Sequence, residues 1–175
     1  MDTAFLISAF VTLFVVIDPL GLAPLFAALT HDESEGRRRA IAIRAVAIGF
    51  SILLVFGLAG EAVLEFVGIS MPAFRISGGL LLFLTALEML FERRTKRRED
   101  QAEEDRPDPS IFPLATPLIA GPGAIASMIL LAGSPNATWA TTAQVIGVMA
   151  TVLTIVLLLF LGGGLLSRLL GKTGI

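Results

Sequence analysis

The sequence contains no cysteine, no tyrosine and a single histidine. Without cysteine the chain can form no disulfide, no thiolate metal site and no cysteine nucleophile. The lone histidine, His31, lies in a charged segment, so we expect no histidine-based metal or acid–base centre. The net charge of −2 gives no electrostatic footprint for nucleic acid. These shortages point away from thiol chemistry, bound metals, other cofactors and nucleic-acid partners.

Charged residues are also scarce and unevenly placed. They make up 16% of the 175 residues, whereas a soluble domain usually carries about 25%. Between Asp108 and Arg168, 59 consecutive residues include no Asp, Glu, Lys, Arg or His. A water-soluble fold of this size cannot hide such a stretch, and a disordered chain would not contain it. The sequence therefore predicts an all-α, multi-pass membrane helix bundle.

Five segments are apolar and long enough to cross a membrane, for which a helix needs about 20 residues. They are residues 4–29, 40–60, 71–91, 111–132 and 143–166. The start of the chain lacks the cationic region of a signal peptide, so we expect the first segment to stay in the mature protein.

Basic residues predict the orientation of the bundle. If successive helices alternate in direction, 12 of the 13 lie on one face and only Arg75 lies toward the other. The positive-inside rule places the basic face in the cytoplasm and the N-terminus outside. Residues 92–110 then form a charged cytoplasmic linker. We expect a solvated loop there, with contact to anionic lipids as the alternative.

Prolines and glycines interrupt the first and fourth segments. The first contains DPLGLAP (residues 18–24), and the fourth contains Pro113 followed by TPLIAGPG (residues 116–123). Prolines remove amide donors and break a helix, and non-helical backbone survives in a membrane only where protein or water satisfies it. Interruptions at corresponding positions of two halves point to a transporter's substrate site. Kinks that only shape packing are the alternative.

The interruptions suggest an inverted three-plus-three repeat with broken first and fourth helices. Residues 1–91 form the first three-helix repeat, residues 92–110 the linker, and residues 111–175 a second repeat of which two helices are visible. An odd number of helices per half inverts the second half relative to the first.

Three stretches carry a resemblance to a known family: DPLGLAP (18–24), FRISGGLLLF (74–83) and FPLATPLIAGPGAI (112–125). They resemble the MarC family of bacterial and archaeal inner-membrane proteins, along essentially the whole chain. Members named SnatA resemble transporters of small neutral amino acids such as glycine and alanine, built as two inverted repeats. The resemblance implies that function, an inner-membrane location and a sixth helix that this sequence does not contain. Many relatives have Asn at the position of Asp18.

The candidate substrate-binding residues lie at the two interruptions: Asp18, Pro19, Gly21, Pro24, Thr116, Pro117, Gly121, Pro122 and Gly123. The carboxylate of an amino acid suits amides at a half-helix N-terminus, and its ammonium suits unwound carbonyls. Asp18 is either an N-cap or a proton-coupling group. Sodium is the other candidate coupling ion.

Two other classes of function compete with transport. A non-transporting scaffold or assembly subunit is the main alternative. An intramembrane enzyme is not expected, because no Ser/His pair or metal-ligand cluster is present. Without a nucleotide-binding Gly-rich motif, ATP-driven transport by this chain alone is not expected. We expect Arg75 to snorkel outward and Glu88 to face the cytoplasmic rim. We expect the glycines at 78–79 and 162–164 to allow close helix packing, with a role as hinges as the alternative.

Overall fold

The computed structural model describes residues 3–91, 108–134 and 137–170, the last eight without their side chains. In these ranges the regular structure is helical: α1 (Thr3–Ile17), α2 (Pro19–Leu29), α3 (Glu35–Val67), α4 (Met71–Leu90), the π-type helix η1 (Ser110–Ile119), α6 (Pro122–Ala132) and α7 (Trp139–Leu170). Most of the predicted linker lies outside the described residues.

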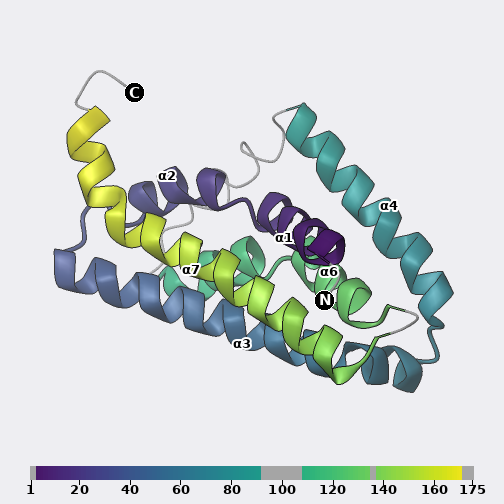
Figure 1. The fold of residues 1–175 in the computed structure, drawn as a ribbon. Helices are drawn as coiled ribbons and strands as arrows, with labels where there is room; N and C mark the ends of the chain where they lie inside the picture. The colour runs from purple at the N-terminus through teal and green to yellow at the C-terminus, as the bar shows by residue number, and fades with distance from the viewer. Residues whose placement is uncertain (1–2, 92–107, 135–136, 171–175) are drawn as a thin grey trace.

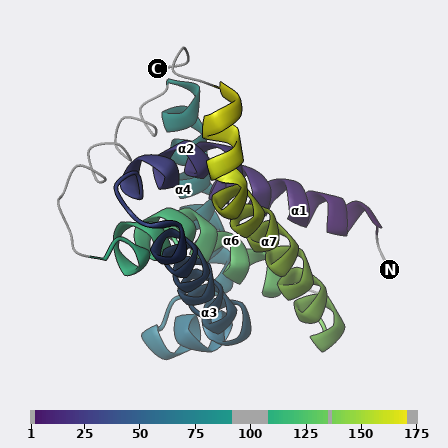
Figure 2. The ribbon, with the colours of Figure 1, turned by 90° about the vertical axis from the view of Figure 1, so that its left-hand side faces the viewer.

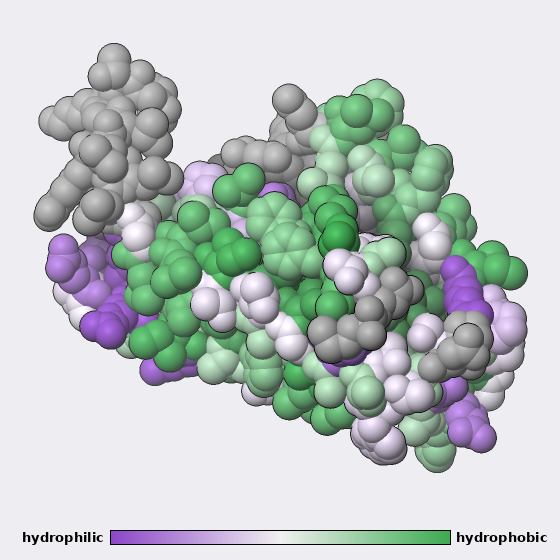
Figure 3. Space-filling model, viewed as in Figure 1, coloured by the Kyte–Doolittle hydropathy of each residue, from purple (hydrophilic) through white to green (hydrophobic). Residues whose placement is uncertain are grey.

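Length and hydropathy identify the spans. Thr3–Leu29, Glu35–Val67, Met71–Leu90 and Trp139–Gly162 each qualify, and η1 with α6 makes a fifth if this pair, bent by 52°, counts as one span. Hydrophobic side chains cover the middle of the face in Figure 3, with hydrophilic ones toward its two ends. The prediction of an all-α membrane bundle is confirmed.

Helix α3 is longer than the segment predicted at residues 40–60. It begins after Ser34, whose hydroxyl accepts a hydrogen bond from the Arg37 amide, and ends at Gly68 in the left-handed conformation (φ 83°). Such an N-cap and a left-handed glycine are common helix ends. Its 33 residues correspond to roughly 50 Å, so α3 exceeds the hydrocarbon thickness and either tilts or projects from it.

The helices pack across the two halves of the chain. α1 and α2 lie along α7, η1 and α6 lie along α3, and α3 and α7 also pack against each other, while α4 lies to one side against α6 (Figures 1 and 2). Each interrupted helix therefore packs on the long helix of the other half. An inverted repeat produces this exchange; the division into repeats stays a prediction.

Glycines on α3 allow η1 and α6 to approach closely. A Cβ atom added to Gly49 would lie 2.6 Å from Cγ2 of Ile119, and one added to Gly60 would lie 2.5 Å from Cγ1 of Ile129. Both glycines are buried. Small residues serve this purpose in membrane bundles, where helix association depends on close van der Waals packing.

The glycine pair of α4 is divided between two roles. Gly78 is buried, and a Cβ atom there would lie 3.1 Å from Cδ1 of Leu130 on α6. Cβ atoms at Gly79 and Gly162 would meet no heavy atom within 4 Å. The prediction of close packing therefore holds for Gly78 and is wrong for Gly79 and Gly162, because these two face away from the described neighbours. The packing of Gly163 and Gly164 lies outside what the structure describes.

Candidate functional site

The first interruption is confined to Asp18. This residue has φ 59° and ψ 66°, which separates α1 from α2, and its Oδ1 accepts a hydrogen bond from the Gly21 amide at 3.0 Å. Pro19 occupies the first helical position, where a missing N–H costs nothing. A side chain at Gly21 would collide with the Asp18 carboxylate. The N-cap interaction considered from the sequence is therefore present, and the coupling role of Asp18 stays a prediction.

Pro24 does not take part in this break. It lies inside α2, which continues to Leu29, so the prediction that both prolines interrupt the first span is wrong. The ring of proline fixes φ near the helical value, and the lost hydrogen bond can be tolerated in a membrane helix. What ends the first helical segment is the left-handed backbone at Asp18.

The second interruption starts one residue earlier and ends two residues earlier than predicted. Phe112 (φ −130°, ψ 127°) and Thr116 (φ −134°, ψ 124°) have extended backbone inside η1, and the peptide bonds before Pro113 and Pro117 are cis. The irregular stretch ends at Gly121, where a side chain would collide with the Pro117 carbonyl oxygen. Residues 122 and 123 already belong to α6 rather than to the break, because proline favours the first position of a helix.

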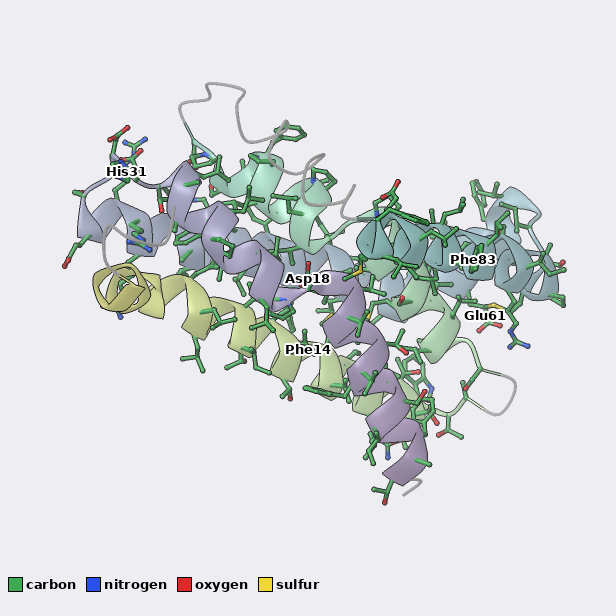
Figure 4. The ribbon with its side chains drawn as sticks, turned by 90° about the horizontal axis from the view of Figure 1, so that it is seen from above. Phe14, Asp18, His31, Glu61 and Phe83 are labelled. Atoms are coloured by element: carbon green, nitrogen blue, oxygen red, sulfur yellow. The ribbon has the colours of Figure 1, made fainter. Side chains whose placement is uncertain are left out.

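The helices that border the two interruptions meet in the middle of the bundle. A Cβ atom at Gly123 would lie 3.1 Å from Cγ1 of Val16 and 3.8 Å from Oγ1 of Thr85. Val16 is two residues before the left-handed Asp18, and Gly123 is two residues after the end of the second break. Figure 4 shows Asp18 midway between His31 and Glu61, which lie at opposite ends of the molecule. α1 and α6 therefore cross close to the point where each broken helix is interrupted.

The predicted binding residues do not all lie at this crossing. Pro19 is buried, and five others are half-buried: Asp18, Gly21, Pro117, Gly121 and Gly123. Pro24, Thr116 and Pro122 are exposed on the described surface. Exposure on a membrane-spanning helix favours contact with lipid over contact with a small polar substrate.

Sequence reasoning missed Val16, Leu82 and Thr85, the three residues beside Gly123. Thr85 lies in the apolar run of α4, and its hydroxyl donates to the Leu81 carbonyl at 2.9 Å, as packing threonines in membrane helices do. Ser127, on α6, likewise donates to the Gly123 carbonyl at 2.8 Å. No local sequence signal distinguishes Thr85 from other threonines, and only its position against Gly123 does.

The two helix N-termini at the crossing differ in charge. The first turn of α2 is capped by the Asp18 carboxylate, whereas no side chain caps α6 at Gly121. First-turn amides have no acceptor within their own helix and carry partial positive charge. The N-terminus of α6 can therefore accept an anionic group, while Asp18 and the C-terminal end of α1 favour a cationic one.

Polar contacts also connect the ends of the helices. The Arg44 guanidinium on α3 pairs with the Asp108 carboxylate before η1. Hydrogen bonds from Ser110, whose amide donates to Asp108 at 3.0 Å, together with the Arg44 charge, lower the pKa of the Asp108 carboxyl. Arg75, expected to snorkel outward, is exposed but donates from Nη2 to the Gly133 carbonyl at 3.1 Å. Within the described ranges, no group of three or more His, Asp or Glu residues is placed to hold a metal ion.

An all-helical bundle with four or five apolar spans and interrupted helices defines a multi-pass integral membrane protein. The comparisons specify it further: the chain belongs to the MarC family of integral membrane proteins, which it matches over residues 3–175. None of the solved structures compared matches the chain.

Three relatives illustrate the extent of the similarity. A UPF0056 membrane protein of Archaeoglobus fulgidus is 35% identical over 98% of this chain and 81% of its own length. One from Methanocaldococcus jannaschii is 40% identical over 75% of this chain and 66% of its own length. The UPF0056 inner membrane protein YhgN of Escherichia coli is 39% identical over 72% of this chain and 63% of its own length. The matched region thus spans about two thirds of the last two relatives.

Proposed function

We propose that this chain is a secondary transporter of small neutral amino acids, such as glycine and alanine, in a bacterial or archaeal inner membrane. The observation that carries the proposal is the approach of Val16 to Gly123, where two interrupted helices meet. Interrupted helices leave backbone groups that need a polar partner inside the membrane. Such paired breaks are typical of transporter substrate sites. A non-transporting scaffold would need neither break.

The chemistry of the crossing matches a zwitterion. The substrate carboxylate binds the first-turn amides of α6 beyond Gly121, and the ammonium binds near Asp18 and the end of α1. The substrate has to be small, because Val16 and Thr85 already lie against Gly123. In this proposal Asp18 couples transport to protons or sodium ions, and the N-terminus of the chain lies outside.

Uptake into liposomes tests the proposal. The purified protein is reconstituted, an inward proton or sodium gradient is imposed, and labelled glycine and alanine are followed. We expect uptake above that of protein-free liposomes, and competition by unlabelled alanine. Absence of such uptake under both gradients would remove the transporter proposal.

A pair of glycine variants locates the site. Gly123→Val adds a side chain against Val16, whereas Gly147→Val on α7 adds one where no heavy atom lies within 4 Å of the new Cβ. We expect the first variant to lose uptake and the second to retain it, with both eluting as folded protein in size-exclusion chromatography. Equal uptake by the two variants would place the substrate elsewhere.

A further inference from the structure

Helix α4 packs on α6 along a single seam of side chains (Figure 1). The α4 residues in this seam recur every three or four positions, and those of α6 do the same in the opposite direction. They are Met71, Arg75, Gly78, Leu82 and Thr85 on α4, and Gly133, Leu130, Ala126 and Gly123 on α6. This spacing is typical of two helices whose side chains interlock. The seam therefore runs from the end of α6 to its first turn, where the broken helices cross.

The inner end of the seam brings three helices around Gly123. A Cβ atom there would lie 3.1 Å from Cγ1 of Val16 on α1, 3.7 Å from Cδ2 of Leu82 and 3.8 Å from Oγ1 of Thr85. All four residues are half-buried. Leu82 and Thr85 are one helical turn apart on the same face of α4. Two branched aliphatic side chains and one hydroxyl therefore border the first turn of α6.

The hydroxyl of Thr85 can serve a ligand in one way only. Its hydrogen is donated to the Leu81 carbonyl at 2.9 Å. The oxygen keeps its lone pairs as acceptors. Thr85 therefore suits a donor such as an ammonium group and does not suit a carboxylate.

We propose that α4 forms a third wall of the substrate site, in which Leu82 limits the size of the substrate side chain and Thr85 accepts a hydrogen bond from the substrate ammonium. This inference rests on the proposed function and deepens it by assigning its selectivity. The substrate carboxylate binds the first-turn amides of α6, to which Gly123 belongs. The α-carbon is bonded directly to that carboxylate, so its side chain extends into the space that Val16 and Leu82 border. A hydrogen or a methyl group fits there, and a branched side chain meets Leu82.

Competition against labelled glycine uptake into liposomes tests the role of Leu82. Leu82→Ala shortens the wall, whereas Leu80→Ala makes the same change on the same helix at a residue that is 58% exposed. We expect alanine to compete and valine not to compete in the wild type and in Leu80→Ala. In Leu82→Ala, valine should compete at a concentration lower by about tenfold or more, because apolar pockets discriminate side chains by about this factor for each methylene. Leu82→Val is a milder change in the same direction, and size-exclusion chromatography checks the folding of each variant.

Two substitutions of Thr85 test the hydrogen bond to the ammonium. Thr85→Val keeps the shape of the side chain without its hydroxyl, and Thr85→Ser keeps the hydroxyl. We expect Thr85→Val to raise the KM for glycine by about tenfold or more with little change in maximal rate, since a hydrogen bond to a charged group is lost. Thr85→Ser should restore the wild-type KM. An equal KM in Thr85→Val and the wild type would show that Thr85 serves packing alone.

The outcomes distinguish this inference from the proposed function. Absence of glycine uptake by the wild type removes both. Wild-type uptake with unchanged valine competition in Leu82→Ala and Leu82→Val removes the inference alone. Equal gains of valine competition in Leu82→Ala and Leu80→Ala would also overturn it, because a general loosening of α4 and not the wall at Leu82 would then explain the result.

Discussion

Arg44 on α3 and Asp108 before η1 form an ion pair between residues 64 positions apart in the chain. The same carboxylate accepts a hydrogen bond from the Ser110 amide at 3.0 Å. The pair connects the first half of the chain to the start of the second, at the face predicted to be cytoplasmic. It also anchors the N-terminal end of η1, the segment that leads into the second helix break.

The Asp108 interactions predict a defined pH dependence. Its pKa in the folded protein is lowered by Ser110 and Arg44, so the stabilisation is present above the unfolded value of about 3.9 and is lost as pH falls through the folded value. Asp108→Asn should therefore reduce stability at neutral pH by about 1 kcal/mol or less, since the pair is partly exposed. Thermal unfolding in detergent, from about pH 7 to about pH 3, measures this. The control is Asp32→Asn, whose side chain is fully exposed; an equal loss in both variants would contradict the prediction.

Close packing at Gly49 predicts a steric effect of a single methyl group. Gly49→Ala brings the new Cβ to 2.6 Å from Cγ2 and 3.1 Å from Cβ of Ile119. The branched side chain of Ile119 cannot move out of the way unless η1 itself moves. We expect a loss of about 1–3 kcal/mol. Gly147→Ala, in open space, should be neutral or stabilising by up to about 1 kcal/mol. Unfolding midpoints of the two variants in detergent compare these effects, and a Gly49→Ala protein as stable as Gly147→Ala would refute the close contact.

Asp18→Asn separates capping from ion coupling. Asparagine preserves the N-cap bond to Gly21 but cannot titrate. If Asp18 couples transport, the variant should bind and exchange labelled glycine as the wild type does, yet fail to accumulate it under a proton gradient. Asp18→Ala should in addition lose about 1 kcal/mol of stability. Accumulation by Asp18→Asn at the wild-type level would show that Asp18 is a structural cap and that the coupling ion binds elsewhere.

The predicted orientation can be tested with single cysteines, because the chain has none of its own. His31→Cys lies between α2 and α3, and Ala137→Cys precedes α7; both positions are exposed. In intact cells an impermeant thiol reagent should label Ala137→Cys, and it should label His31→Cys only after the membrane is opened. The reverse labelling pattern would invert the bundle.

Local features of the sequence were enough to predict the spans and the existence of both breaks. Hydrophobic length and the absence of charge act within a single helix, so each predicted segment falls on an observed span, although α3 extends beyond residues 40–60 at both ends. The exact limits of the breaks were less predictable. The backbone is helical at Pro24 and extended at Phe112. The conformation at each residue depends on how neighbouring helices satisfy its backbone groups, and not on proline content alone.

Contacts between distant segments could not be derived in the same way. Val16 and Thr85 lie beside Gly123 only because α1, α4 and α6 converge. The ion pair between Arg44 and Asp108 required the packing of η1 on α3. In each case the residue type is ordinary for its own helix, and its role arises from the tertiary arrangement.

The exchange of partners between the two halves has a consequence for biogenesis. α1 and α2 pack on α7, which is synthesised about 110 residues after α2 ends. At roughly 5–20 residues per second, the first span waits for roughly 5–20 s without its final neighbour. During that interval the polar Asp18 is held by Gly21 of its own span. The hydrogen bond between the Gly21 amide and the Asp18 carboxylate thus satisfies this polar side chain within the first span before α7 is synthesised.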